Sequence, residues 1–158
     1  QCVGQRDRIE AILNYIDDAF PGTRLMPGDI HRRTRAAQIM SVFNSYAYRP
    51  IVWDIFVPHA FPEPGKPRDE ARIAAAVPKA ERALGAIEAL IVTPDPYFFG
   101  RQISLADLLL EPAIHYLETT PEGKAMLPKF PKLAAWHTAI QLLASVKDTV
   151  PKVLSGQE

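Results

Sequence analysis

Apolar residues recur at helical spacing along most of this chain, and prolines and glycines divide the recurrence into blocks. In the first block Ile9, Ile12 and Ile16 fall three or four residues apart, which places them on one face of a helix. No run alternates apolar and polar residues between turn signals, as a half-buried strand would. The sequence therefore predicts an all-α fold of about five to seven helices. The expected helical ranges are 6–20, 30–57, 69–90, 104–119, 122–127 and 131–144.

Prolines inside two of these helices should disturb them, because proline lacks a backbone N–H and crowds the preceding turn. We expect Pro50 to bend the second helix, Pro58 to end it, and Pro78 to interrupt the third. Residues 21–29 contain two prolines and two glycines, a composition typical of a linker. This segment is the candidate junction between two domains.

The stretch SLAD at 104–107 is a helix-start signal. Ser104 is a preferred N-cap, and the Asp107 carboxylate can accept a hydrogen bond from the Ser104 backbone N–H. In this reciprocal capping box, two backbone donors that would otherwise lack partners are satisfied. Ser104 and Asp107 are therefore expected to be structural residues at the start of a buried helix.

Charge and hydropathy exclude several classes of function. Eighteen basic residues balance eighteen acidic ones, so no excess positive charge is available for nucleic acid or an anionic membrane surface. No run of about 18 apolar residues occurs, so no membrane span is expected. The single cysteine, Cys2, cannot form an internal disulfide, which fits a reducing, cytoplasmic compartment.

Motifs that carry chemistry are sparse. The four histidines, His31, His59, His115 and His137, lack the spacing of a zinc site, so no metal is expected. The chain has no G-x-S-x-G elbow, no Gly-rich phosphate loop and no C-x-x-C pair. We therefore expect no catalytic residue in this chain.

One stretch, NSYAYRPIVWDIF, is chemically denser than the rest. Its Tyr46, Arg49 and Trp53 are candidate binding residues, because aromatic side chains with polar tips can line an apolar pocket and hydrogen-bond at its mouth. The alternative is that Trp53 and one tyrosine belong to the core and the others to the surface. Arg49 can bind an anionic group or pair with an acidic side chain such as Asp54. The residues alone leave these alternatives open.

Four stretches follow one another in an order that is typical of a known family. They are AILNYIDDAFPG at 11–22, Arg35-Ala36 with Gln38, FFGRQISLAD at 98–107, and LPKFPKLAAWHTAIQLLASVKDT at 127–149. Together they resemble the glutathione S-transferase family, and the whole is similar to bacterial members. The resemblance implies that residues 1–20 are the last helix of a thioredoxin-like domain, 21–29 a linker, and 30–158 the helical C-terminal domain. The rest of the thioredoxin-like domain would then be absent from this chain.

In this family, glutathione is bound mainly by the thioredoxin-like domain, which also activates its thiol. The resemblance therefore implies a glutathione transferase that takes glutathione as co-substrate and transfers it to a small hydrophobic electrophile. The activating residue would lie upstream of Gln1, and the chain alone would be inactive. Tyr46, Arg49 and Trp53 would line the wall for the electrophile.

The chain departs from the family pattern at the glutathione site. Members have an acidic residue or Gln followed by Ser before the A-I pair, and this chain has Arg8 and Ile9 there. Isoleucine cannot hydrogen-bond a carboxylate. The departure leaves room for two other functions, a non-catalytic helical protein-interaction module and a helical protein that binds small apolar ligands without turnover.

The first helix also bears on assembly. If no thioredoxin-like partner covers it, Ile9, Ile12 and Ile16 should be exposed. An apolar patch of this kind promotes association, so we expect a homodimer or a higher oligomer.

Overall fold

Helices make up the regular structure in the computed structural model of the chain, which describes residues 6–62, 64–91 and 96–149. The elements are α1 (Arg6–Ala19), α2 (Ile30–Val42), the π-helical stretches η1 (Phe43–Ala47) and η2 (Arg49–Phe56), α3 (Val57–Ala60), α4 (Glu70–Leu90), α5 (Leu105–Glu118), α6 (Pro121–Met126), the 3₁₀ turn η3 (Leu127–Lys129), α7 (Pro131–Ile140) and α8 (Ala144–Thr149). Joined where they are continuous, the described helices form seven segments, and no strand is found among them. The all-α prediction is confirmed.

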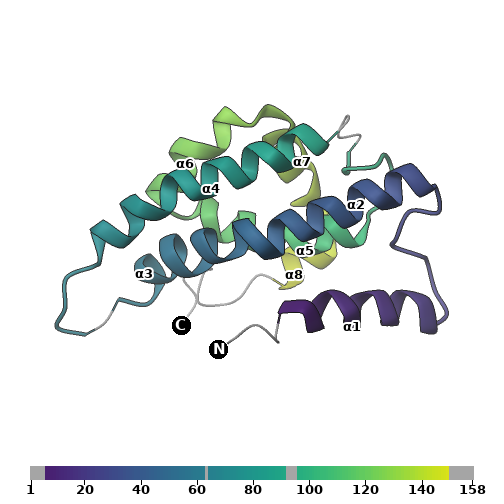
Figure 1. Ribbon diagram of the computed structural model, residues 1–158, viewed down its shortest axis with the longest axis horizontal. Helices are drawn as coiled ribbons and strands as arrows, with labels where there is room; N and C mark the ends of the chain where they lie inside the picture. The colour runs from purple at the N-terminus through teal and green to yellow at the C-terminus, as the bar shows by residue number, and fades with distance from the viewer. Residues whose placement is uncertain (1–5, 63, 92–95, 150–158) are drawn as a thin grey trace.

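Residues 30–60, from α2 to α3, form one continuous rod that runs antiparallel to α4 and packs alongside it (Figure 1). α5 packs against this rod, and α6 and α7 contact α5 in turn, which makes α5 the central helix of the bundle. α1 lies at the edge, below α2 in the view of Figure 1. Within the described ranges, no helix has both the length and the apolar character that crossing a bilayer requires.

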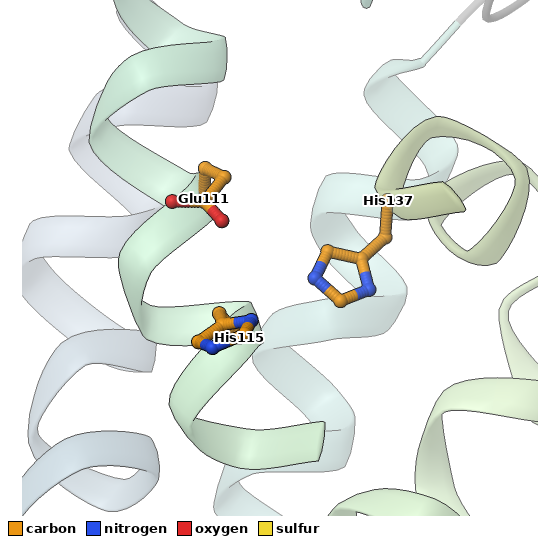
Figure 2. Close-up of side chains that lie close together, drawn as sticks. All are labelled: Glu111, His115 and His137. Carbon is orange, nitrogen blue, oxygen red and sulfur yellow. The ribbon is translucent and has the colours of Figure 1, made fainter. Parts of the chain in front are cut away.

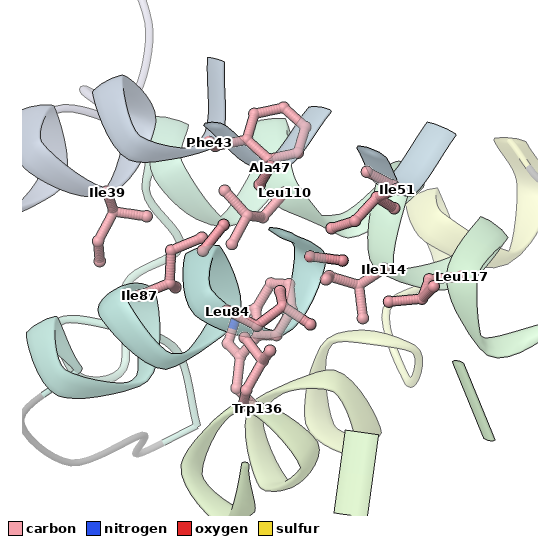
Figure 3. Packing of buried hydrophobic residues seen from close by; sticks show 14 of the residues in the cluster. Ile39, Phe43, Ala47, Ile51, Leu84, Ile87, Leu110, Ile114, Leu117 and Trp136 are labelled. Atoms are coloured by element: carbon pink, nitrogen blue, oxygen red, sulfur yellow. The ribbon is translucent and has the colours of Figure 1, made fainter. Parts of the chain in front are cut away.

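The core is formed where the rod, α4, α5 and α7 face one another (Figure 3). Trp136 of α7 is fully buried and stacks on Phe98, with 4.4 Å between the ring centroids. Helical spacing places two apolar faces on the rod. The face of Met40, Phe43, Ala47 and Ile51 is buried. On the other face Ile39 is buried and Val42 half-buried, whereas Tyr46 and Trp53 are exposed, so only the first face packs inward throughout.

Two of the expected proline effects are wrong. The rod continues two residues past Pro58, and α4 runs unbroken through Pro78. Pro78 is exposed, and so is Ala74, whose carbonyl loses its helical partner, so water can supply the missing donor. Around Pro50 the rod takes π-helical hydrogen bonding, in which the bond spans five residues and the turn is wider than in an α-helix.

Capping side chains mark the predicted starts of two helices. Asp29 and Asp69 each accept a hydrogen bond at 2.9 Å from the backbone N–H three residues later, at the starts of α2 and α4. The last predicted helix is too long, because α7 ends at Ile140 and a turn separates it from α8. There the Leu143 N–H donates to the Ile140 carbonyl at 3.1 Å, a bond that spans three residues rather than the four of an α-helix.

α1 presents its apolar face to solvent, as the sequence predicts. The exposed fractions of Ile9, Ile12 and Ile16 are 52%, 55% and 49%. Another side of α1 contacts the segment that follows it: the Asp17 carboxylate accepts hydrogen bonds from Leu25 N at 2.6 Å and Met26 N at 3.0 Å. α1 is therefore anchored through polar contacts, while its three isoleucines remain uncovered.

Candidate functional site

Asp107 lies fully buried at the start of α5, where its carboxylate collects four donors. Oδ2 accepts from Ser104 N at 2.8 Å and from the Ser104 hydroxyl, and both reciprocal bonds of the capping box are present. Oδ1 accepts from Phe98 N at 3.0 Å and from Trp136 Nε1 at 2.7 Å. Burial raises the pKa of the Asp107 carboxyl, and the hydrogen bonds from these three residues oppose the rise. This arrangement joins α5, α7 and the preceding loop, and it is structural.

A cleft of about 580 Å³ lies between the rod and α4. Its lining from the rod includes Val42, Tyr46, Arg49, Pro50 and Asp54, and its lining from α4 includes Lys79, Arg82 and Ala83. Tyr46 is 69% exposed at this cleft, so its ring is available to a ligand. Two of the three predicted binding residues, Tyr46 and Arg49, thus border one cavity.

Trp53 does not line the cleft, although it is 49% exposed. From the rod, the cleft is lined by residues three or four positions apart: Val42, Ser45, Tyr46, Arg49, Pro50 and Asp54. Trp53 falls outside this set.

The charged rim of the cleft is partly neutralised by ion pairs. Arg49 Nε lies 3.7 Å from Asp54 Oδ2, and Arg72 Nη2 lies 2.8 Å from Asp54 Oδ1. Arg49 therefore does both things that the sequence leaves open, because it borders the cleft and pairs with Asp54. Its side chain is 68% exposed, which weakens the pair by solvent screening.

Three side chains that no local pattern connects meet between α5 and α7: Glu111, His115 and His137 (Figure 2). One ligand atom from each lies within 4.8 Å of the others. Glu111 Oε1 is buried and has no hydrogen-bond partner among the described residues. Glu111 and His115 are four residues apart on α5, a spacing visible in the sequence, but His137 comes from another helix. The spacing of the histidines along the sequence therefore did not reveal that His115 and His137 lie together in the fold.

Burial shifts the pKa of two of these side chains, Glu111 and His137. It raises the pKa of the Glu111 carboxyl, against the attraction of His115. It lowers the pKa of His137, while the Glu118 carboxylate acts in the opposite direction. The Gln141 side chain adjoins both rings, with Nε2 at 3.1 Å from His137 Nε2 and 3.5 Å from His115 Nδ1.

His137 predicts a pH dependence of stability. Its folded pKa is lowered from 6.5, so between the two values the unfolded chain binds more protons than the folded one. The free energy of unfolding should therefore fall as the pH falls below about 6.5 through the lowered value. His137→Gln should flatten this part of the profile. Urea unfolding between about pH 8 and pH 5, with a chelator present, measures it, and equal slopes for both proteins would contradict the prediction.

The remaining histidines lie elsewhere. His59 Nε2 contacts Glu122 Oε2 at 2.8 Å, and its Nδ1 lies 3.2 Å from Arg68 Nη1. His31 is exposed near the start of α2, at a second cleft of about 400 Å³ that Phe99 also lines. Neither histidine joins the group between α5 and α7.

Comparison with known proteins finds similarity to glutathione S-transferases. A sequence model described as glutathione S-transferase, C-terminal domain, matches residues 70–139. Glutathione S-transferase Z2 of Arabidopsis thaliana is 28% identical over 142 residues, which cover 90% of this chain and 61% of the relative. The zeta-class glutathione S-transferase of Euphorbia esula is 26% identical over 144 residues, which cover 89% of this chain and 60% of the relative. The chain thus spans about three fifths of the length of these two relatives.

Solved structures agree with the sequence comparison. Glutathione transferase F7 from Populus trichocarpa superposes with a TM-score of 0.69 at 26% identity, over 94% of this chain and 68% of that one. Poplar glutathione transferase F1 superposes with a TM-score of 0.70 at 27% identity, over 94% of this chain and 67% of that one. Over most of its length the chain is thus similar in sequence to glutathione S-transferases, and its helices have the fold of the C-terminal domain of that family.

Proposed function

We propose that this chain is the helical, electrophile-binding portion of a glutathione transferase. The full-length protein would use glutathione as co-substrate and transfer it to a small hydrophobic electrophile. The observation that carries the proposal is the similarity to two proteins named as glutathione S-transferases, over 90% and 89% of this chain.

The proposed domain division follows from α1. Residues 1–20 would be the last helix of a thioredoxin-like domain, 21–29 the linker and 30–158 the helical domain. The exposed Ile9, Ile12 and Ile16 support this division, because an apolar stripe on a helix is normally covered by a packed partner. The linker itself is non-helical and tied back to α1 through Asp17.

The two substrates would bind to different parts of the protein. The thioredoxin-like domain would hold glutathione and supply the residue that activates its thiol, so the chain alone should be inactive. Tyr46 and Arg49 would contact the electrophile in the cleft between the rod and α4, where an aromatic face and a cation are available. Trp53, the third residue predicted from the sequence, lies outside that cleft and is left out of the proposed electrophile site.

Two assays on the full-length protein test this function. We expect retention on immobilised glutathione and conjugation of a generic aromatic electrophile at a rate above the spontaneous one. The chain of 158 residues should show neither, because it would lack the site that activates the thiol. Failure of both assays with the full-length protein would overturn the proposal. Conjugation by the chain alone would overturn the claim that the thioredoxin-like domain is needed to activate glutathione.

The exposed α1 face also leads us to propose self-association. The chain should form a homodimer or a higher oligomer at micromolar concentration, because Ile9, Ile12 and Ile16 stay in water in the monomer. Light scattering measures the mass. Replacing Ile12 and Ile16 with Ser should shift the mass toward the monomer, and a monomeric mass for the unchanged chain would contradict the prediction.

A second candidate function is a non-catalytic helical interaction module. Ile9 favours it, since an apolar, 52% exposed side chain stands where the family binds the γ-glutamyl end of glutathione. For either function we propose a cytoplasmic location, since the single cysteine fits a reducing compartment. We propose neither nucleic acid nor membrane as partner, because basic and acidic residues balance. The bacterial origin remains a prediction, as both curated relatives are plant proteins.

A further inference from the structure

We propose that Glu111, His115 and His137 form a transition-metal site that takes zinc. Two imidazoles and one carboxylate are a donor set that zinc accepts with a fourth position left for water. Carboxylate oxygen and imidazole nitrogen together also favour zinc over calcium or magnesium, which prefer oxygen ligands throughout. Below, the three residues are called the Glu-His-His cluster.

The unsatisfied Glu111 oxygen is the first observation in favour of a metal. Glu111 is 8% exposed, and its buried Oε1 has no hydrogen-bond partner among the described residues. Leaving a buried carboxylate oxygen without a partner is unfavourable, whether the group is charged or neutral. A cation bound between Glu111 and the two histidines would supply the missing interaction.

The geometry of the Glu-His-His cluster is close to that of an occupied site. Ligand atoms about 2.1 Å from a tetrahedral zinc ion lie about 3.4 Å apart, and here the three lie within 4.8 Å of one another. Side-chain rotations that move these atoms by about 1 Å would bring them to that separation. α5 presents Glu111 and His115 one turn apart, and Figure 2 shows the His137 ring reaching toward them from the facing helix α7. Since α5 and α7 pack against each other, these positions are held by the fold.

Residues around the Glu-His-His cluster would orient and support the ligands. Gln141 Nε2 lies 3.1 Å from His137 Nε2, 3.5 Å from His115 Nδ1 and 3.0 Å from Glu118 Oε2. A metal-binding histidine donates the N–H of its other ring nitrogen to an acceptor, so in an occupied site the Gln141 amide would present Oε1 rather than Nε2 to such a ring. The Glu118 carboxylate adds a second negative charge near the site.

Calorimetric titration of the untagged, metal-free chain with zinc chloride tests the proposal. We expect one zinc per chain with a dissociation constant in the micromolar range or tighter. Glu111→Gln keeps the shape of the side chain, and His137→Gln removes one nitrogen ligand; each should weaken binding about 10-fold or more. His59→Gln is the matched control, because His59 also contacts a glutamate but lies outside the Glu-His-His cluster. It should bind zinc as the unchanged chain does.

Cobalt absorption provides an independent readout. Cobalt(II) bound in place of zinc should give the visible spectrum of a tetrahedral site, and Glu111→Gln should abolish it. Circular dichroism checks that each variant folds. If His137→Gln does not fold, Glu111→Gln alone tests whether the Glu-His-His cluster binds zinc. Absence of saturable zinc binding, or equal binding by Glu111→Gln and the unchanged chain, would overturn the site. Neither measurement involves glutathione, so the outcome is independent of the proposed transferase function.

Discussion

Replacing Asp107 with alanine should lower the free energy of unfolding by about 3–5 kcal/mol. The substitution removes the shared acceptor of Ser104 N, Phe98 N and Trp136 Nε1, and all three donors remain in the buried region. Each buried donor left without a partner costs about 1–3 kcal/mol. Part of this loss is offset because burial of the carboxylate, which raises the pKa of Asp107, is itself unfavourable.

Urea unfolding with tryptophan fluorescence measures this effect, since Trp136 is one of the donors that lose their acceptor. Ser104→Ala is the matched control: it removes the capping hydroxyl but keeps the Asp107 carboxylate, and should cost only about 1 kcal/mol. The two variants thus distinguish the loss of the helix cap from the loss of the carboxylate that links α5, α7 and the loop before α5. A cost for Asp107→Ala no greater than that for Ser104→Ala would contradict the structural role assigned to the carboxylate.

Gly123→Ala should destabilise the fold by about 3 kcal/mol or more. Gly123 lies in the first turn of α6, against the end of α5. A Cβ atom there would lie 1.8 Å from Leu117 O and 2.4 Å from the Leu117 carbonyl carbon, so one helix end must move. The movement would also disturb the bond from Gly123 N to the Thr120 hydroxyl, 3.1 Å long, that caps α6.

Gly85→Ala is the matched control for this experiment. Gly85 lies inside α4, and a Cβ atom there would meet Phe130 Cε1 at 3.7 Å, an ordinary contact. Alanine forms helix better than glycine by about 1 kcal/mol, so this variant should be as stable as the unchanged chain or more so. Thermal unfolding compares the three proteins. Equal melting temperatures for Gly123→Ala and the unchanged chain would show that α6 does not approach α5 as closely as described.

The parts of the fold that could be predicted from sequence are those determined locally. Helical periodicity gives α1 and the buried face of the rod, and short-range side-chain signals give the starts of α2, α4 and α5 at Asp29, Asp69 and Ser104. The proline rule fails at Pro58 and Pro78 because it describes an isolated helix. In the folded chain, packing of neighbouring helices holds the backbone helical, and water can supply a lost donor.

The functional residues depend on contacts that no local pattern contains. The candidate residues Tyr46 and Arg49 border the same cleft and Trp53 does not, and their closeness in the sequence could not separate them. Likewise, the capping box reveals the bond between Ser104 and Asp107 but not the donation from Trp136, which lies 29 residues further along the chain. The Glu-His-His cluster was missed for the same reason, since α7 supplies one of its members.

The central claim about function is the proposal that the helical portion binds the electrophile while the thioredoxin-like domain binds glutathione. Steady-state kinetics of the full-length protein test this claim most directly. Tyr46→Ala should raise the KM for an aromatic electrophile about 5–10-fold and leave the KM for glutathione unchanged, because under the proposal the lost ring would contact only the electrophile. Leu142→Ala, at a side chain 72% exposed outside the cleft, should change neither KM. A rise in the KM for glutathione with an unchanged KM for the electrophile would contradict the account.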